Sequence, residues 1–208
     1  MKRKIFGKQL IVIILILTLL TTSAFCTESV MATTVKKEYA INSVANQKTL
    51  TRENLVKFAK KYYGKNLKYF LDRNTPCFWD SYWCAMYMSY VTKTVIPKSQ
   101  VAKKSDALCS KWYNSLPKTI KKVVYKKPLK KRYVPQKGDI IFFEYDRYTK
   151  GVDHVGMVVS VNKKKHTVTT IEGNINNKNR NADYHHTYVL YRTYKMTDTH
   201  LYAYVKTV

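Results

Sequence analysis

The chain has 208 residues, and its 38 lysines and arginines against 13 aspartates and glutamates give a net charge of +25. This length suits one domain with a buried core, and the absence of any repeat argues against a repeat array or a chain of several domains. The positive charge attracts polyanions over about one Debye length, ~8 Å in physiological salt.

Residues 1–32 have the pattern of an export signal. Four basic residues within the first eight positions precede an apolar run over 10–20, and Ala32 ends a small-residue site that resembles signal-peptidase sites. The apolar run is shorter than the roughly 20 residues that a membrane span needs. We therefore expect a secreted, cell-wall-associated protein that meets the membrane only transiently; an uncleaved anchor is the alternative.

The next stretch of the chain is expected to lead into the folded part. Residues 33–50 lack apolar periodicity and are expected to be flexible. A helix is predicted over 52–63 from the helical spacing of its apolar side chains, with Gly64 at its end. Residues 65–80 are aromatic and interrupted by Pro76, and are expected to be irregular.

Two further helices are predicted before the strands begin. Asp80 or Ser81 can cap a helix that runs to about residue 92. Cys84 lies in the first turn of this helix. A third, shorter helix is predicted from Ser105. All the predicted helices thus precede the predicted strands.

The second half of the chain favours antiparallel strands. The lysine-dense segment 118–132 is expected to be a solvated sheet edge or a binding strip for an anionic polymer. Strands are predicted over 123–125, 140–143, 154–161, 166–172, 187–194 and 201–206. Helices followed by antiparallel strands predict an α+β fold.

Three cysteines follow the signal segment: Cys77, Cys84 and Cys109. Their number is odd, so a bridge between Cys77 and Cys109 would leave Cys84 free, and all three could instead be reduced. The sequence has no CxxC pair and no close His/Cys cluster, so a zinc site is not expected.

Cys84 is the candidate nucleophile. A thiol with the ordinary pKa of about 8.5 is mostly protonated at neutral pH, whereas the reactive form is the thiolate. The unsatisfied N–H groups at a helix start lower a thiol pKa, and a nearby imidazolium lowers it further. The same N–H groups can stabilise the oxyanion of a tetrahedral intermediate.

A predicted hairpin places an imidazole beside an acid or an amide. Antiparallel pairing across the lysine turn 162–165 sets His154 opposite about residue 173, so a one-residue change of register brings either Glu172 or Asn174 to it. Cysteine, histidine and an orienting polar group form the set of a thiol hydrolase. Alternation along the strand directs four side chains away from His154, namely Val155, Met157, Val159 and Val161.

Four short motifs resemble those of the CHAP domain, the cysteine, histidine-dependent amidohydrolase/peptidase family. The resemblance covers roughly residues 52–206, within a catalytic domain expected over 51–208. The motifs are Trp83-Cys84-Ala85-x-x-Met88-Ser89-Tyr90-Val91, Pro135-x-x-Gly138-Asp139-Ile140-x-Phe142-Phe143, Asp153-His154-Val155-Gly156 and Thr170-Ile171-Glu172-Gly173-Asn174.

This resemblance implies a papain-like α+β fold, with N-terminal helices packed on an antiparallel sheet or half-barrel. It implies cleavage of an amide bond in peptidoglycan, by an N-acetylmuramoyl-L-alanine amidase or an endopeptidase. Carried over, Cys84 is the nucleophile, His154 the base, Glu172 the orienter and Asn174 an accessory polar group. We expect the motif neighbours Trp83 and Asp153 to contact substrate.

The sequence also departs from the family pattern. Some CHAP enzymes bind calcium through an acidic loop before the nucleophile, but here that region offers only Asp72 and Asp80, so we expect no metal and no cofactor. No separate wall-binding domain is visible, and the basic surface is expected to bind anionic wall polymers instead. The alternatives are a non-catalytic cationic wall-binding protein and a secreted basic toxin or nucleic-acid binder; export argues against nucleic acid.

Overall fold

The computed structural model divides the chain into two units, residues 1–47 and 48–208, and the second unit carries the sheet with its covering helices. No helix among the described residues is long and apolar enough to cross a membrane. The predicted signal segment lies outside the described part. The structure describes residues 33–34, 37–38, 40–146, 151–176 and 183–208.

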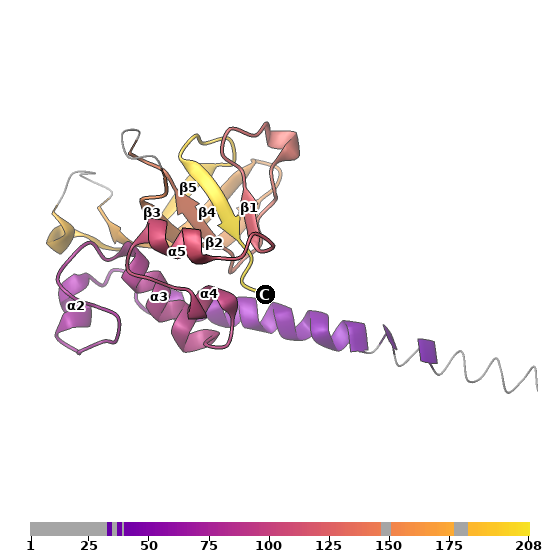
Figure 1. Ribbon diagram of the computed structural model, residues 1–208, viewed down its shortest axis with the longest axis horizontal. Coiled ribbons are helices and arrows are strands. Elements are labelled where there is room, and N and C mark those ends of the chain that lie inside the picture. The colour runs from indigo at the N-terminus through magenta and orange to yellow at the C-terminus, as the bar shows by residue number, and fades with distance from the viewer. Residues whose placement is uncertain (1–32, 35–36, 39, 147–150, 177–182) are drawn as a thin grey trace, which may run out of the picture. The chain divides into compact units, whose positions relative to one another are not determined.

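Six antiparallel strands form one sheet in the order β1-β6-β2-β3-β4-β5 (Figure 1). This sheet, with helices placed before it in the chain, confirms the α+β, papain-like prediction. The predicted edge strand is β1, which begins two residues earlier than expected. The strands are β1 Lys121–Val123, β2 Ile140–Phe143, β3 His154–Asn162, β4 Thr167–Ile175, β5 Tyr188–Lys195 and β6 Leu201–Val205.

Helices precede the sheet, and some of them were not predicted. Residues 40–60 are helical, so helical structure begins before the helix predicted over 52–63 and includes part of the lead expected to be flexible. Short helices were missed because four or five residues are too few to show a helical period. The labelled helices are α2 Leu67–Leu71, α3 Cys84–Val95, α4 Gln100–Lys103 and α5 Cys109–Ser115, with 3-10 turns η1 Leu129–Lys131 and η2 Tyr184–His186.

The start of α3 differs from the prediction. Trp83 is the N-cap residue and makes no side-chain cap, so neither Asp80 nor Ser81 caps the helix. Asp80 instead pairs with His185, at 3.3 Å between Oδ1 and Nε2. The helix therefore begins at Cys84 itself, which confirms that this residue lies in the first turn.

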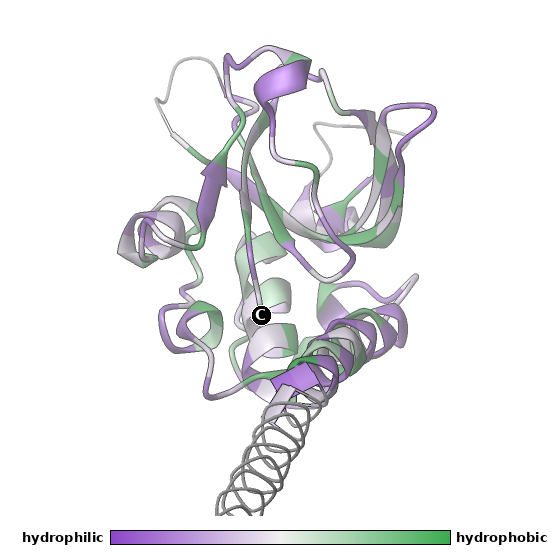
Figure 2. Cartoon of the chain, turned by 90° about the vertical axis from the view of Figure 1, so that its right-hand side faces the viewer, coloured by the Kyte–Doolittle hydropathy of each residue, from purple (hydrophilic) through white to green (hydrophobic). Residues whose placement is uncertain are grey.

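The sheet is buried on both faces, which explains the uninterrupted apolar run of β2. Ile140 and Phe142 belong to the larger core cluster, which includes the residues of α3. Ile141 and Phe143 belong to a second cluster with residues of β3 to β6. In Figure 2 green marks stretches of the strands, and hydrophilic colour marks several connecting loops. A strand covered on both faces has no polar side to alternate with.

Helix α3 packs against β3 and β4 and is buried along most of its length. Its Tyr87 donates a hydrogen bond of 2.6 Å to the carbonyl of Ala59, which ties α3 to the helical segment 48–60 of the same unit. Figure 1 shows α3 and α4 on one side of the sheet. A helix that is apolar on nearly all sides is held by the core around it.

A bulge in β3 changes which face its side chains meet. The register with β4 shifts between Val158 and Ser160. Val155, Met157 and Val159 lie in the larger cluster, as predicted. Val161 packs against the second cluster, so the prediction that all four share one face is wrong for Val161. The extra residue of the bulge changes the face of the sheet on which the following side chains lie.

Candidate active site

Trp83 fixes the place where α3 begins. Its indole N–H donates to the hydroxyl of Thr187 at 3.0 Å and to the carbonyl of Tyr184 at 3.2 Å. The ring is fully buried, 5.8 Å from the ring of Phe70 and 6.4 Å from that of Tyr87. The prediction that Trp83 contacts substrate is therefore wrong, because the side chain lies inside the core and positions the helix start.

Cys84 follows as the first residue of α3 and is buried. The charge of His154 and the backbone N–H of Ala85 both lower the pKa of its thiol. N–H groups at a helix start lack partners within the helix, and they carry the positive end of its dipole. The predicted nucleophile and base thus lie near enough for their charges to affect each other, and their catalytic roles stay a prediction.

Glu172 is the acid that reaches the imidazole. Its carboxylate oxygen lies 2.8 Å from Nε2 of His154, and the carboxylate is fully buried. The sequence left Glu172 and Asn174 as alternatives for this contact. The amide oxygen of Asn174 instead accepts a 2.8 Å hydrogen bond from Thr187, the residue that also holds Trp83.

Gly156 lets Glu172 reach the ring. A Cβ added at Gly156 would lie 2.5 Å from Cγ of Glu172, so the glutamate side chain crosses the strand where β3 has no side chain. Gly173 plays a similar part against α3, because a Cβ there would lie 2.8 Å from the Trp83 ring and 2.9 Å from Cβ of Tyr87. Both glycines stand in the motifs, but sequence reasoning gave them no role.

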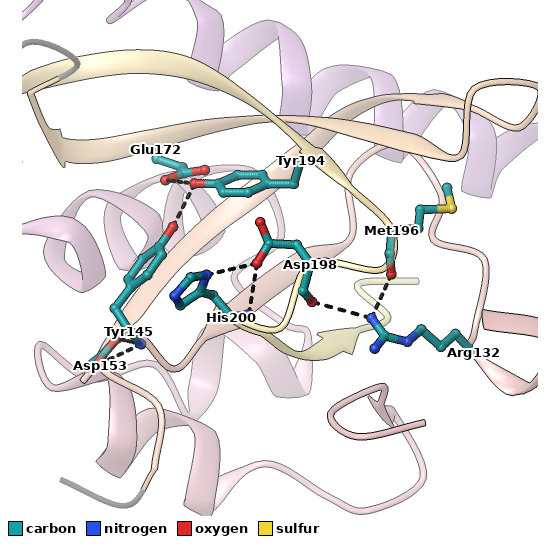
Figure 3. A network of polar contacts seen from close by, with 8 residues as sticks. All are labelled: Arg132, Tyr145, Asp153, Glu172, Tyr194, Met196, Asp198 and His200. Atoms are coloured by element: carbon teal, nitrogen blue, oxygen red, sulfur yellow. Dashed lines mark hydrogen bonds and ion pairs between the residues drawn. The ribbon is translucent and has the colours of Figure 1, made fainter. Parts of the chain in front are cut away.

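Hydroxyl groups surround the buried carboxylate of Glu172. Thr170 donates to the oxygen that does not face His154, and Tyr194 donates to the other at 3.3 Å. Tyr145 lies 2.7 Å from the Tyr194 hydroxyl, and Figure 3 shows this chain from Tyr145 through Tyr194 to Glu172. Burial raises the pKa of both tyrosines, so they stay protonated donors. A buried charge needs such partners.

Cys109 is a residue of the site to which sequence reasoning gave no role. All three described cysteines are free, so the bridge considered between Cys77 and Cys109 is not formed. The sulfur of Cys109 lies 3.6 Å from that of Cys84, and both side chains are buried. Cys77 lies apart from them, with its sulfur 3.8 Å from Nζ of Lys93.

The charges of this cluster favour a thiolate. Hydrogen-bond donation from Cys109, then the charge and hydrogen bond of His154, hold the pKa of Cys84 well below its usual range against the opposing effect of burial. Donation to the Cys84 thiolate and burial raise the pKa of Cys109 well above its usual range. Burial lowers the pKa of His154, but the thiolate and Glu172 outweigh it and raise this pKa to about 10.

A cavity of about 920 Å³ opens onto the nucleophile. Cys84, Cys109 and Asp153 lie in its wall, together with the exposed rings of Trp79 and Tyr82. The carboxylate of Asp153 accepts N–H bonds of 2.9 Å from Tyr145 and 2.6 Å from Asp146 and so holds the turn after β2. Asp153 lines the cavity, and its contact with substrate stays a prediction.

No group of three or more histidine, cysteine or acidic residues within the described ranges is arranged to hold a metal ion. The side chains of the site offer a thiolate, an imidazolium and an acid that orients the ring. This arrangement suits nucleophilic attack followed by proton transfer to a leaving group.

The family comparison covers the segment that carries this cluster. The model of the CHAP domain matches residues 76–174, a range that contains Cys84, Cys109, His154 and Glu172. A search of curated proteins finds no match for the chain. The family match and the α+β fold agree with the motifs from which the resemblance was inferred. The chain therefore contains a CHAP domain, which the family model matches over residues 76–174.

Proposed function

We propose that this protein is an exported peptidoglycan hydrolase that cleaves an amide bond through a thiol ester on Cys84. The CHAP domain indicates peptidoglycan hydrolase or amidase activity in general. The observation that carries the finer proposal is the buried 2.8 Å contact between His154 and Glu172, beside a Cys84 thiol whose pKa the charge of His154 lowers.

In the first half of the proposed reaction, the Cys84 thiolate attacks the carbonyl carbon of the amide. Negative charge then develops on the carbonyl oxygen, and the free N–H groups at the start of α3 are suited to stabilise it; one such donor is worth about 3–4 kcal/mol in known enzymes. His154 gives its proton to the departing amine, which leaves a thiol ester on Cys84.

In the second half, neutral His154 takes a proton from water, and the resulting hydroxide attacks the thiol ester. Collapse of the intermediate releases the carboxylic acid and returns the thiolate, while His154 is again an imidazolium. Glu172 stabilises the charged ring and keeps Nε2 occupied, so the other ring nitrogen faces the sulfur. Protons and charges balance over the two halves.

The proposed substrate is the amide between N-acetylmuramic acid and L-alanine, or a peptide bond of the stem or cross-bridge. Family membership supports peptidoglycan as the polymer. The exposed rings of Trp79 and Tyr82 in the cavity wall are suited to stack against its sugar or peptide groups. The net charge of +25 supports attraction to anionic wall polymers, and the basic start of the chain supports export.

Clearing of purified cell walls tests the proposal. The wild-type protein is expected to lower the turbidity of a wall suspension, and Cys84→Ala is expected to bind walls without clearing them. Cys77→Ser is the matched control, because Cys77 lies outside the cluster, and it should clear walls normally. Equal clearing by Cys84→Ala would remove Cys84 as nucleophile, and binding without clearing by the wild type would favour a non-catalytic wall-binding protein.

Mass spectrometry of the digested walls then identifies the bond. An amidase releases peptides with a free L-alanine amino group, whereas an endopeptidase leaves the stem attached to muramic acid and creates a new amino group within the peptide. The proposal predicts one of these two amide products. New reducing ends on the sugar chain alone would show glycosidase chemistry and contradict it.

A further inference from the structure

We propose that Cys84 and Cys109 form a reversible redox pair, which peroxide-class oxidants convert into a disulfide. The two sulfurs lie 3.6 Å apart, at the first residues of α3 and α5. Neither the family match nor the proposed hydrolysis requires a second thiol at this place. Hydrolysis uses Cys84, His154 and Glu172, and leaves Cys109 with a nucleophile next to it and no chemical step of its own.

The distance is close to what a disulfide needs. A disulfide bond is about 2.05 Å long, so the sulfurs must approach by roughly 1.5 Å, which is within the range of side-chain rotation and a small shift of a short helix. Helix α5 has seven residues and is preceded by Leu108, whose side chain is exposed. Cys77 has no such partner among the described cysteines, because Cys84 and Cys109 face each other.

The pair is buried, yet a small oxidant can reach it. Both cysteines lie in the wall of the 920 Å³ cavity that opens beside the nucleophile. The thiolate of Cys84 is the reactive form toward peroxide. Neutral Cys109 beside it matches the arrangement of a redox-sensitive cysteine next to a resolving cysteine.

The chemistry balances in two steps. The Cys84 thiolate attacks one oxygen of the peroxide, so an S–O bond forms and the O–O bond breaks; hydroxide leaves and takes the proton of His154, which gives water and a sulfenic acid. The Cys109 sulfur then attacks the sulfenic sulfur, so the S–S bond forms and the S–O bond breaks. The second hydroxide leaves with the Cys109 proton as water. Two thiols are oxidised and one peroxide is reduced.

The disulfide has a functional consequence that rests on the proposed function. A sulfur bonded to Cys109 cannot attack an amide, so oxidation would stop hydrolysis, and a dithiol would restore it. The pair also protects the nucleophile, because a sulfenic acid that condenses with a neighbouring thiol is withdrawn from further oxidation to the irreversible sulfinic acid.

Peptide mapping of peroxide-treated protein tests the pair directly. The full-length wild-type protein is treated with hydrogen peroxide, its remaining thiols are alkylated, and it is digested without reductant. The expected product is a peptide pair joined by a Cys84–Cys109 disulfide, with the intact protein about 2 Da lighter and Cys77 alkylated. Free thiols at both sites after treatment, or a disulfide that includes Cys77, would overturn the proposal.

Cys109→Ser is the informative variant, and Cys77→Ser is its matched control. Without the resolving thiol, Cys84 should advance to sulfinic acid, about 32 Da heavier, and dithiothreitol should fail to restore activity. Wild type and Cys77→Ser should regain most of their own untreated activity. Equal recovery by Cys109→Ser would contradict the proposal. The disulfide map does not depend on hydrolytic activity. It therefore still tests the redox pair if the reduced protein fails to clear walls.

Discussion

Glu172 is a charged side chain without solvent contact, and its neighbours account for this. Thr170 and Tyr194 donate to the carboxylate, and His154 meets it at 2.8 Å. An unpaired buried carboxylate would take up a proton instead, because a low-dielectric surrounding penalises charge. The Cys84 thiolate and Glu172 together thus favour the imidazolium form of His154 in the folded protein.

Glu172→Gln tests this assignment through pH. Glu172 raises the pKa of His154, which is about 10, so its neutral replacement should lower that pKa. Since the imidazolium is the proton donor to the leaving amine, the alkaline limb of the activity profile should move to lower pH. We expect activity at neutral pH to fall by about a hundredfold, the lower end of what a general acid–base group contributes.

The measurement is wall clearing as a function of pH for both proteins, with Thr169→Val as the control. Thr169 lies on the same strand and is only half-buried, with its hydroxyl 3.0 Å from that of Thr193. The control should keep the alkaline limb of the wild type. An unchanged alkaline limb in Glu172→Gln would show that Glu172 does not set the charge of His154.

Cys109 gives a second prediction at the scale of one residue. Its thiol donates to Cys84 and is the largest cause of the lowered pKa of Cys84. Cys109→Ala should therefore raise the pKa of Cys84, and the thiolate should be lost at a higher pH as the solution is acidified. Cys109→Ser keeps a donor of similar size. The pKa of Cys84 in this variant should therefore lie between its values in the wild type and in Cys109→Ala.

Alkylation of Cys84 by iodoacetamide, followed by mass spectrometry across acid to neutral pH, measures this shift. The thiolate is the reacting form, so the acid limb of the rate follows the pKa of Cys84. Near neutral pH the wild-type protein should label at Cys84 faster than at Cys77. An identical acid limb for Cys109→Ala and wild type would remove Cys109 from the electrostatics of the site.

At the scale of elements, the paired strands β3 and β4 bring the acid to the base. Gly156 is the residue that makes this passage possible, because a Cβ there would meet Cγ of Glu172 at 2.5 Å. Gly156→Ala should push Glu172 away from His154 and lower activity at least tenfold. The cost in folding stability should be about 1–3 kcal/mol, the usual range for an added methyl group in a packed core.

Ser160→Ala provides the control for Gly156→Ala, since Ser160 is an exposed residue of the same strand. Both variants are compared by wall clearing and by thermal unfolding monitored by circular dichroism. Ser160→Ala should change neither quantity appreciably. Full activity in Gly156→Ala would mean that Glu172 can reach the ring by another path, and the proposed role of the glycine would be wrong.

The elements also show how far the sequence could predict the site. The hairpin that joins His154 to Glu172 was predictable, because strand alternation and a short turn limit the register to a few choices. The contact between Cys84 and Cys109 was not, since it depends on how two helices pack against a sheet. Trp83 was placed wrongly for the same reason: an aromatic residue next to a nucleophile has the same pattern whether it faces a cavity or the core.

For the whole molecule, the net charge of +25 raises the question of where anionic polymers bind. Two lysine groups can be compared at equal charge. Lys126, Lys127 and Lys130 are exposed beside the edge strand β1, and Lys163, Lys164 and Lys165 are exposed in the turn between β3 and β4. If binding to anionic polymers depends only on net charge, loss of either lysine group should weaken it equally.

We expect the edge group to matter more, because the segment 118–132 is dense in lysine and its strand β1 forms an edge of the sheet. Replacing the three edge lysines by glutamine should weaken binding of the Cys84→Ala protein to purified walls by about threefold or more, an effect that should shrink at high salt as the Debye length falls from about 8 Å toward 3 Å. Replacement of the three turn lysines removes the same charge at another place and should weaken binding less. Equal losses in a sedimentation assay would show that attraction to the wall is spread over the whole surface and that the edge is no binding strip.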